Sequence, residues 1–463
     1  MTFDQYPLKE QQQRIDRYKK YERIFIGDHW TAFNMNSAYR EEEIKAVEYV
    51  ATNFAGLLSR VSADLLFEEF PKIEAGDNQE FIDAVIQGCG LKAQFYESGL
   101  ETSFRGDALF RTRAKDNQLR IEDINPSNWS PQIDASNIRK DPESHTLFYT
   151  HQIPTAGKPK KVVHLEIHKK GKIVNELYEI EDSGKVGAKL DIELYKEQLG
   201  IEDVIQETKI DSFLVTHIPN YRINTSYFGI SDYIDIEPLM YALNNRLTRV
   251  DKILNKHGDP ILAVPSGVLD EEGRVARGSF GVIEVDSREG NGAKPEYIVW
   301  DAKLESAFLE IDKLVDFMFL AGDLSPAILG MDKDGQAESG RALKFKMLRT
   351  IAKKHRKQLY YDAGLKDLLY TAQDFAFKNG LEVDGVKSKK PEEVTIEWQD
   401  GVINDALEQV ELEERRLDND LTSPVDAIMR IDGVTKQEAE QTYSEALKSR
   451  KNKIPTFNAE PKV

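Results

Sequence analysis

Cysteine is almost absent from this 463-residue chain, which contains only Cys89. A single cysteine excludes an internal disulfide, suits assembly in a reducing cytoplasm, and is most simply interpreted as a small buried apolar side chain. Long apolar runs are also missing, because no stretch approaches the roughly 20 residues that a membrane span needs. Residues 1–10 lack the basic and then apolar pattern of a signal peptide. We therefore expect a soluble protein.

Positive charge is in short supply as well. Lys and Arg number 62 against 80 Asp and Glu, which gives a formal net charge of -18. A chain that grips nucleic acid by neutralising phosphates would have the opposite balance, so we expect any contact with DNA to be weak or local. Hydrophobic residues make up 40% of the chain and charged residues 31%, a globular balance. The length predicts about two to four structural regions.

The motifs that resemble enzyme or metal sites are incomplete. Residues 335–342 have the glycine spacing of a phosphate-binding loop but lack the lysine and the hydroxyl that contact phosphate and magnesium. Residues 332–335 resemble part of a calcium loop without its downstream glutamate. His164, Glu166 and His168 alternate on one strand face, which we interpret as the polar side of a half-exposed sheet rather than as a metal site. The sequence therefore predicts no catalytic residue, cofactor or metal.

Apolar periodicity predicts helices first and strands after them. Helical spacing covers residues 9–26 and residues 40–67. Between residues 106 and 180 the pattern changes to short alternating segments, as expected for a β-rich or α/β region. The predicted strands are 108–113, 119–124, 146–153, and a hairpin of 162–168 with 172–180 that turns at Lys170-Gly171.

A helix, a β insertion and a second helix come next. The first helix covers 236–257, with Pro238 in its first turn and Gly258 at its end. Short β segments follow over 261–300, and the second helix covers 303–321 with one apolar face. At ~1.5 Å per residue each helix is roughly 30 Å long, so the pair predicts a rod with the β insertion at its tip.

The last third of the chain is predicted to be mainly helical. A Gly- and Asp-rich loop, 322–338, leads into one long helix from Ser339 to about Lys378, with a kink expected at Gly364. A strand at 394–398 and polar helices follow. The final helix opens with a capping box, Thr435 to Glu438, and residues 451–463 are expected to be a disordered tail.

Two basic features stand out against the acidic whole. The first runs from Arg341 to Lys357, with eight Lys or Arg and no Asp or Glu. The second is a stripe on the 236–257 helix. These cations either pair with acidic groups of this chain or of a neighbouring copy, or face DNA, and the sequence leaves both readings open. The first feature comprises Arg341, Lys344, Lys346, Arg349, Lys353, Lys354, Arg356 and Lys357, and the second Asn245, Arg249, Lys252 and Lys256.

Several short runs follow one another in a fixed order over nearly the whole chain. They are Asn53-Phe54-Ala55, Phe67-Glu68-Glu69-Phe70-Pro71, Gly106-Asp107-Ala108, Ile124-Asn125-Pro126, Gly229-Ile230-Ser231-Asp232, Pro238-Leu239, Ala242-Leu243-Asn244, Asp259-Pro260, Ser339-Gly340-Arg341-Ala342-Leu343, and Trp398 with Asp400 and Asp405. In order and spacing they resemble the recurring blocks of the portal, or head-tail connector, proteins of long-tailed double-stranded DNA bacteriophages.

That resemblance implies an α+β fold made of an α/β wing, a two-helix stem, a small β clip and a helical crown, here a reduced one. The implied regions are 1–235 (N-terminal part of the wing), 236–257 (stem helix), 258–301 (clip), 302–321 (stem helix), 322–338 (tunnel loop), 339–400 (long helix and C-terminal part of the wing) and 401–463 (crown and tail).

The resemblance also implies a function without catalysis. A homododecameric ring at one vertex of the virion capsid, assembled in the host cytoplasm, would be the channel for DNA packaging and ejection. Its expected partners are the terminase large subunit, the scaffold and major capsid proteins, a head-completion adaptor, and the double-stranded DNA that passes through. Another capsid or head-completion protein, or a DNA-processing nuclease, remains the alternative. The DNA-channel candidates are Arg249, Lys252, Lys256, Asp332, Lys333, Asp334 and Lys344, and the terminase-contact candidates in the clip are Asp270, Glu271, Glu272, Arg274 and Arg277.

Overall fold

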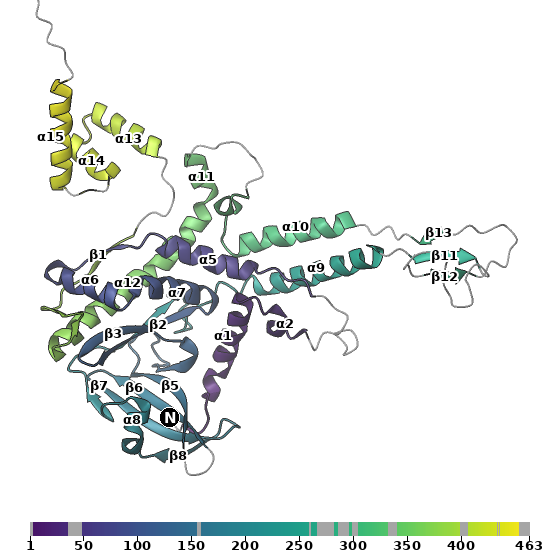
Figure 1. The fold of residues 1–463 in the computed structure, drawn as a ribbon, viewed down its shortest axis with the longest axis horizontal. Coiled ribbons are helices and arrows are strands. Elements are labelled where there is room, and N and C mark those ends of the chain that lie inside the picture. Colours follow the sequence, from purple (N-terminus) through teal and green to yellow (C-terminus); the bar gives the residue numbers. More distant parts are fainter. Residues whose placement is uncertain are drawn as a thin grey trace, which may run out of the picture. The chain divides into compact units, whose positions relative to one another are not determined.

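The computed structural model divides the chain into two compact units (Figure 1). The first comprises Met1–Ile328 and Arg349–Gln399, and the second Leu329–Leu348 and Asp400–Val463. The first unit combines helices with sheets, which confirms the predicted α+β class. The residues that the structure describes are 3–35, 49–154, 159–258, 261–265, 282–285, 296–298, 304–331, 340–398, 406–432, 434 and 436–452.

Three helices form the centre of the first unit and share one apolar core. They are α5 (Phe54–Phe67), α7 (Leu91–Phe104) and α12 (Leu348–Asn379). Gly99 lets α7 approach α5 closely, because a Cβ at this position would lie 3.2 Å from the Cβ of Ala63. This close packing fixes the helices against which the later segments of the chain are anchored.

One face of this helical core is covered by a five-stranded sheet with the order β10-β2-β3-β14-β15. The predicted strands at 108–113 and 119–124 are confirmed as β2 and β3, which form a hairpin. Asp116 and Asn117 turn it with φ angles of 52° and 61°, the left-handed pair that a tight hairpin requires. The five strands are β2 (Asp107–Lys115), β3 (Gln118–Asp123), β10 (Val215–Pro219), β14 (Glu382–Val383) and β15 (Val386–Lys387).

A second, antiparallel sheet has the order β4-β5-β6-β7-β8, with β9 paired to β7. The hairpin of β6 and β7 turns at Lys170-Gly171 as predicted, and Gly171 has a φ of 86°. The strands are β4 (Trp129–Gln132), β5 (Ser144–Ile153), β6 (Lys160–Lys169), β7 (Lys172–Ile180), β8 (Val186–Leu190) and β9 (Ile205–Glu207).

The polar face of β6 is buried, so the predicted half-exposed face is wrong. His164 and His168 are 5% and 1% exposed. Glu166 accepts hydrogen bonds from Arg111 (Nη1 to Oε2, 2.8 Å) and bonds His168 (Nε2 to Oε1, 2.6 Å). Burial alone would raise the pKa of Glu166, but the bond to His168 and the charges around it lower this pKa to about 2. Arg111 lies on β2, a strand of the five-stranded sheet, and its guanidinium therefore neutralises the carboxylate on this face of β6.

The predicted helix, β insertion and helix are confirmed. Helix α9 spans Glu237–Gly258 and α10 spans Leu304–Ala321. They lie side by side (Figure 1), and Arg246 Nη2 contacts Glu310 Oε1 at 2.5 Å. Between them in sequence is a three-stranded sheet of order β12-β11-β13. Its strands are β11 (Ile261–Pro265), β12 (Val282–Val285) and β13 (Glu296–Ile298).

Several predicted boundaries are wrong. The helix expected over 40–67 is not helical at residues 49–53, because the side chain of Asn53 caps α5 by accepting the N–H of Gly56 at 2.9 Å. The helix expected from Ser339 is two helices, separated at Met347. The expected tail begins later than 451, since α15 continues to Asn452.

Gly364 lies within the unbroken α12, where a Cβ would meet Ile218 of β10 at 2.6 Å. The missing side chain therefore serves close packing of helix on sheet. The remaining elements of the first unit are η1 (Lys9–Gln11), α1 (Gln12–Phe25), α2 (His29–Ala32), β1 (Lys72–Glu74), η2 (Gly76–Asn78), α6 (Gln79–Gly88), η3 (Pro126–Asn128), η4 (Ile192–Tyr195), α8 (Lys196–Leu199), η5 (Pro326–Leu329) and β16 (Thr395–Glu397), which pairs with β1.

The second unit is helical over its described residues. Arg430 Nη2 of one helix contacts Glu413 Oε2 of another at 2.8 Å, which ties the two together. The polar helices predicted near the end of the chain are thus confirmed. The helices of this unit are α11 (Gly340–Lys346), α13 (Ala406–Asp418), α14 (Pro424–Asp432) and α15 (Lys436–Asn452).

Candidate functional site

A short segment between β10 and α9 crosses the end of α7 and sets the position of the paired helices. Ser231 Oγ donates to the carbonyl of Phe104 at 2.7 Å, and the N–H of Asp232 donates to the carbonyl of Ser103 at 2.9 Å. These donors satisfy carbonyls that the end of a helix leaves unpaired. The start of α9 is therefore fastened to the helical core only a few residues before the helix begins.

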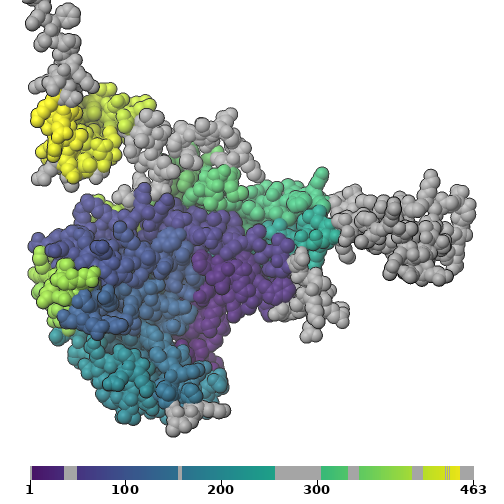
Figure 2. Space-filling model, viewed as in Figure 1, coloured from purple at the N-terminus to yellow at the C-terminus, as the bar shows by residue number. Residues whose placement is uncertain are grey.

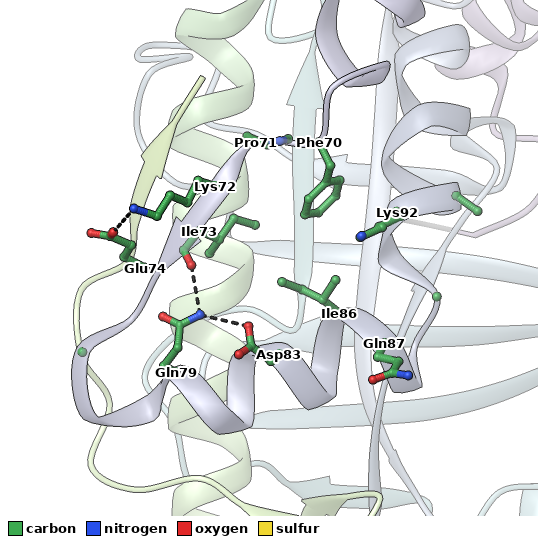
Figure 3. A pocket seen from close by; sticks show the side chains of 13 residues that line it. Phe70, Pro71, Lys72, Ile73, Glu74, Gln79, Asp83, Ile86, Gln87 and Lys92 are labelled. Atoms are coloured by element: carbon green, nitrogen blue, oxygen red, sulfur yellow. Dashed lines mark hydrogen bonds and ion pairs between the residues drawn. The ribbon is translucent and has the colours of Figure 1, made fainter. Parts of the chain in front are cut away.

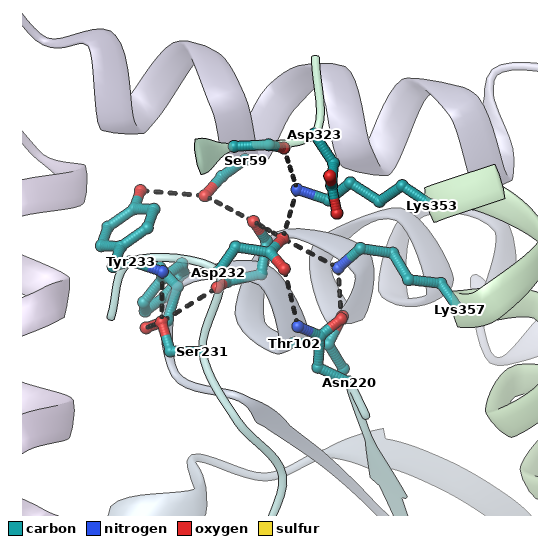
Figure 4. Close-up of polar contacts among 12 residues, drawn as sticks. Ser59, Thr102, Asn220, Ser231, Asp232, Tyr233, Asp323, Lys353 and Lys357 are labelled. Atoms are coloured by element: carbon teal, nitrogen blue, oxygen red, sulfur yellow. Dashed lines mark hydrogen bonds and ion pairs between the residues drawn. The ribbon is translucent and has the colours of Figure 1, made fainter. Parts of the chain in front are cut away.

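Asp232 is the centre of a buried ionic cluster (Figure 4). Its Oδ2 lies 3.2 Å from Lys353 Nζ and 3.0 Å from Lys357 Nζ, and the three side chains are only 6%, 4% and 3% exposed. Asn220 donates to Oδ1 at 2.8 Å, and Ser103 Oγ donates to Oδ2 at 2.8 Å. We call Asp232, Lys353 and Lys357 with these two polar neighbours the charge centre.

The charge centre holds one carboxylate against two ammonium groups. Burial alone would raise the pKa of Asp232, but Lys353 and Lys357 outweigh it and hold this pKa well below its ordinary range. Burial lowers the pKa of Lys357 to about 8, with Lys353 adding to the effect and Asp232 opposing it. Asp232 thus stays ionised, and Lys357 releases its proton more readily than an exposed lysine does.

The same two turns of α12 also hold the end of α10. Lys353 Nζ donates to the carbonyl of Gly322 at 2.9 Å. The carboxylate of Asp323 contacts Arg349 Nη2 at 2.6 Å and Arg356 Nη2 at 2.7 Å. We call these last three residues the Asp323 clamp. Because α12 binds both the segment before α9 and the segment after α10, the two helices of the antiparallel pair are fixed to one element at the same end.

Residues 244–248 of α9 are also hydrogen-bonded to the segment before α5. The N–H of Thr52 donates to Asn244 Oδ1 at 3.1 Å, and the N–H of Val50 donates to Thr248 Oγ1 at 3.1 Å. Asn244 and Thr248 are buried. Thr248 directly precedes Arg249, the first exposed basic side chain of α9.

Asp107 forms another buried polar group, next to β10. Its carboxylate accepts from the N–H of Gly229 at 2.7 Å and from the hydroxyl of Tyr18, and His217 Nε2 lies 2.6 Å from its Oδ1. Asp107 is fully buried and the ring of His217 packs against Trp129. Both oxygens of the carboxylate bond neighbours in the chain, which is the pattern of a structural cross-link.

A cavity of about 1120 Å³ opens beside β1, α6 and the start of α7 (Figure 3). Among the described residues that line it there is no histidine, cysteine or serine. Lys72 pairs with Glu74 at 2.7 Å, Asp83 accepts a hydrogen bond from Gln79, and the ammonium group of Lys92 lies over the ring of Phe70. Over the described part of the chain, no group of three or more His, Cys, Asp or Glu is arranged to hold a metal ion.

The structure separates the candidate residues that the sequence suggested. Arg249 and Lys252 are exposed on one face of α9, and Lys344 is exposed on α11 in the other unit. The other candidates lie outside the described residues or have side chains that do. These are Lys256, Asp270, Glu271, Glu272, Arg274, Arg277, Asp332, Lys333 and Asp334.

Five of the eight cations between Arg341 and Lys357 are buried or paired within the chain. Lys353, Lys354 and Lys357 are buried, and Arg349 and Arg356 pair with Asp323 within the chain. The alternative in which these cations pair with acidic groups of the same chain is therefore correct for Arg349, Lys353, Arg356 and Lys357. Sequence reasoning missed Asp232 as the partner of Lys353 and Lys357. The available signal was the i, i+4 spacing of Lys353 and Lys357, which puts them on one helix face with the buried Tyr361.

The fold and this site define a class. It is an α+β protein whose paired helices are fastened at one end, beside a buried ionic cluster, with no assembled group of catalytic side chains in the part described. Comparison with known families then names the group. The family model for phage portal proteins of the SPP1 Gp6-like type matches residues 4–452, and the chain belongs to this family. It is thus a portal protein, and a portal occupies a vertex of the capsid.

The most similar solved structures in this comparison come from gene transfer agent (GTA) particles. The virion of the native particle contains a chain with 11% identity and a TM-score of 0.44, and the match covers 82% of this chain and 89% of that one. The neck of the native particle, computed with C12 symmetry, gives 12% identity and a TM-score of 0.44 over 82% and 90%. A comparison with curated protein sequences finds no significant match.

Family membership decides between the alternatives that the sequence left open. It favours the portal over another capsid protein and over a nuclease, and the family is one of structural proteins. None of the described helices is long and apolar enough to cross a membrane. The predicted head-tail connector in a phage-like virion is therefore confirmed at the level of the family.

Proposed function

We propose that copies of this chain close into a ring, a dodecamer as the family resemblance implies, around a channel for packaging and ejecting double-stranded DNA. The observation that carries this proposal is the uncovered apolar surface of α10. Leu309 is 62% exposed, Phe317 53% and Leu320 59%, although α10 already packs against α9. Large apolar side chains gathered on one face mark an interaction surface. One face of the helix pair is seen in Figure 2.

The regions of the chain take the roles that the resemblance implies. Helices α9 and α10 act as the stem around the channel, and residues 258–301 act as the clip. The wing is formed by 1–235 with 339–400, the tunnel loop by 322–338, and the crown by 401–463. The charge centre supports this assignment, because a stem that carries load needs a rigid attachment to the wing and α12 provides one for both helices.

The partners follow from the same roles. The clip residues, Asp270 to Glu272 with Arg274 and Arg277, form the contact with the terminase large subunit during packaging. The wing and crown meet the scaffold and major capsid proteins, and a head-completion adaptor binds after packaging. In the tunnel loop, Lys333 between Asp332 and Asp334 touches passing phosphates without holding them tightly, in keeping with the net charge of -18.

Electron microscopy of the purified protein tests the ring directly. We expect closed rings with an axial hole. Changing Leu309 and Leu320 together to Asp should yield folded subunits that do not assemble, because charge replaces the apolar contact. Leu194→Asp is the matched control, since Leu194 is 75% exposed on a different part of the first unit. Wild-type protein that stays monomeric at micromolar concentrations would contradict the proposal.

A further inference from the structure

Helix α9 carries a row of side chains that includes exposed basic residues. Tyr241, Asn245, Arg249 and Lys252 follow one another at spacings of three or four residues, so they share one side of the helix. Tyr241 is 40% exposed, and Arg249 and Lys252 are exposed as well. Thr248, three residues after Asn245 and four before Lys252, lies on the same side but is buried and bonded to Val50, and the ring of Tyr241 packs against Phe33. Leu243 and Val250 mark the buried opposite side of the helix.

Helix α10 has a corresponding stripe of the opposite charge. Glu305, Leu309, Asp312, Asp316 and Leu320 also recur at spacings of three or four residues, and all five are exposed. Two leucines and three carboxylates therefore form one continuous face. The contact with α9 in the same chain uses a different side of α10, the side that holds Glu310 and the buried Met318.

The two helices also differ in charge along their whole length. Helix α9 contains four Lys or Arg against two Asp or Glu, whereas α10 contains four Asp or Glu and only Lys313 as a cation. Within one chain Arg246 and Glu310 form an ion pair between the two helices, and Asp316 pairs with Lys313 of its own helix. Each copy thus presents a basic stripe on one helix and an acidic stripe on the other.

We propose that in the ring the basic stripe of α9 packs against the acidic stripe of α10 of the next copy. The inference rests on the proposed ring. A ring is built from a heterologous contact, in which two different and complementary surfaces of the same chain meet. These two stripes are complementary in charge, and each places a large apolar side chain, Tyr241 or Leu309, beside its charges.

The register of the helix pair indicates which residues meet. Helices α9 and α10 run in opposite directions, with Arg246 level with Glu310. At a rise of ~1.5 Å per residue, Arg249 lies ~4.5 Å from that level and Glu305 ~7.5 Å from it in the same direction. Rotation about a ring axis parallel to the helices preserves these heights. The flexible side chain of Arg249 then reaches Glu305 of the neighbour, with Asp312 the next carboxylate along the stripe.

This contact gives Arg249 a different role from the DNA contact that its charge first suggests. A guanidinium engaged by the neighbouring carboxylates is not available to phosphates in the channel. The two roles make opposite predictions for charge reversal, because one affects the association of subunits and the other affects only the passage of DNA.

Charge reversal with rescue is the test. In Arg249→Glu, an acidic side chain faces the acidic stripe of α10, so the two surfaces repel each other. We expect the protein concentration for half-maximal ring formation to rise roughly tenfold. Native mass spectrometry measures this concentration. The change of Glu305 and Asp312 together to Arg should weaken assembly similarly. All three changes in one chain should restore it. Lys115→Glu, a reversal at an exposed hairpin end, is the matched control and should leave assembly unchanged. Circular dichroism checks that each variant is folded.

A second measurement does not depend on charge. Arg249→Cys combined with Glu305→Cys, in a Cys89→Ser background, should form disulfides between subunits under oxidation, and either single cysteine should not. If Arg249→Glu rings assemble like the wild type, or if the three changes together fail to restore assembly, the inference is wrong while the ring stands. If wild-type protein forms no ring, the proposed function fails first, and the inference fails with it.

Discussion

Helices α12 and α9 differ in the burial and pairing of their positively charged side chains. On α12, Lys353 and Lys357 are buried against Asp232, and each has its counter-charge within the chain. On α9, Arg249 is exposed beside an exposed Tyr241. Buried ions need partners before the fold can form, whereas exposed ions can wait for another molecule. The first arrangement therefore belongs to folding of the single chain, and the second is the one that we propose for assembly.

The largest effect is expected at the charge centre. Asp232→Ala leaves two buried lysines without their carboxylate, and should lower the free energy of unfolding by about 3–5 kcal/mol. Urea denaturation followed by fluorescence measures this. Asp235→Ala, at an exposed carboxylate three residues later, is the control and should change stability by less than about 0.5 kcal/mol. Equal stabilities for the two variants would show that the cluster is not what holds this segment.

The pH dependence of stability tests the surplus charge of the same cluster. The pKa of Lys357 is lowered to about 8 in the folded protein, below the value of about 10.4 in an unfolded chain. Between these two values the unfolded chain binds more protons, so stability should rise with pH, by on the order of 1–3 kcal/mol. Lys357→Met should remove this rise. Lys378→Met, at an exposed lysine of α12, should keep it, and an unchanged slope in Lys357→Met would refute the assignment.

A smaller effect is expected at the Asp323 clamp, where the partners are more exposed. Arg349 and Arg356 side chains are 70% and 43% exposed, so neutralising Asp323 should cost about 0.5–1 kcal/mol. Asp323→Asn is the suitable change, because φ at this residue is 52° and asparagine tolerates the left-handed region. Asp420→Asn, at an exposed aspartate with a φ of 58°, controls for the backbone. Thermal unfolding at low and high salt should show the difference shrinking as salt screens the pairs.

Local sequence patterns predicted those elements whose apolar spacing and end signals agree. The boundaries of α9 follow from Pro238 in its first turn and Gly258 at its end, and the β6-β7 hairpin follows from Lys170-Gly171. The same reasoning failed at 49–53, where the cap formed by Asn53 outweighs a helical pattern. It also failed at Met347, where no glycine or proline marks the break between α11 and α12.

The charge centre could not be predicted in the same way, because its members come from distant parts of the chain. Lysines are usually exposed, so Lys353 and Lys357 indicate a surface until Asp232 is placed beside them by the packing of α7 against α12. His164 and His168 show the same limit, since the arginine that covers their strand, Arg111, lies on another sheet. Burial of polar groups is decided by tertiary contacts, which single-strand periodicity does not encode.

The difference between α12 and α9 is tested most directly by hydrogen exchange. The exchange is measured on assembled rings and on subunits that carry both Leu309→Asp and Leu320→Asp. Amides of α9 around Arg249 should exchange more slowly in the ring, because a neighbour covers their exposed face and suppresses local opening. Amides of α12 from Lys353 to Tyr361 should exchange at the same rate in both, since their contacts are complete in one chain. Assembly that protects α12 and leaves α9 unchanged would contradict the account.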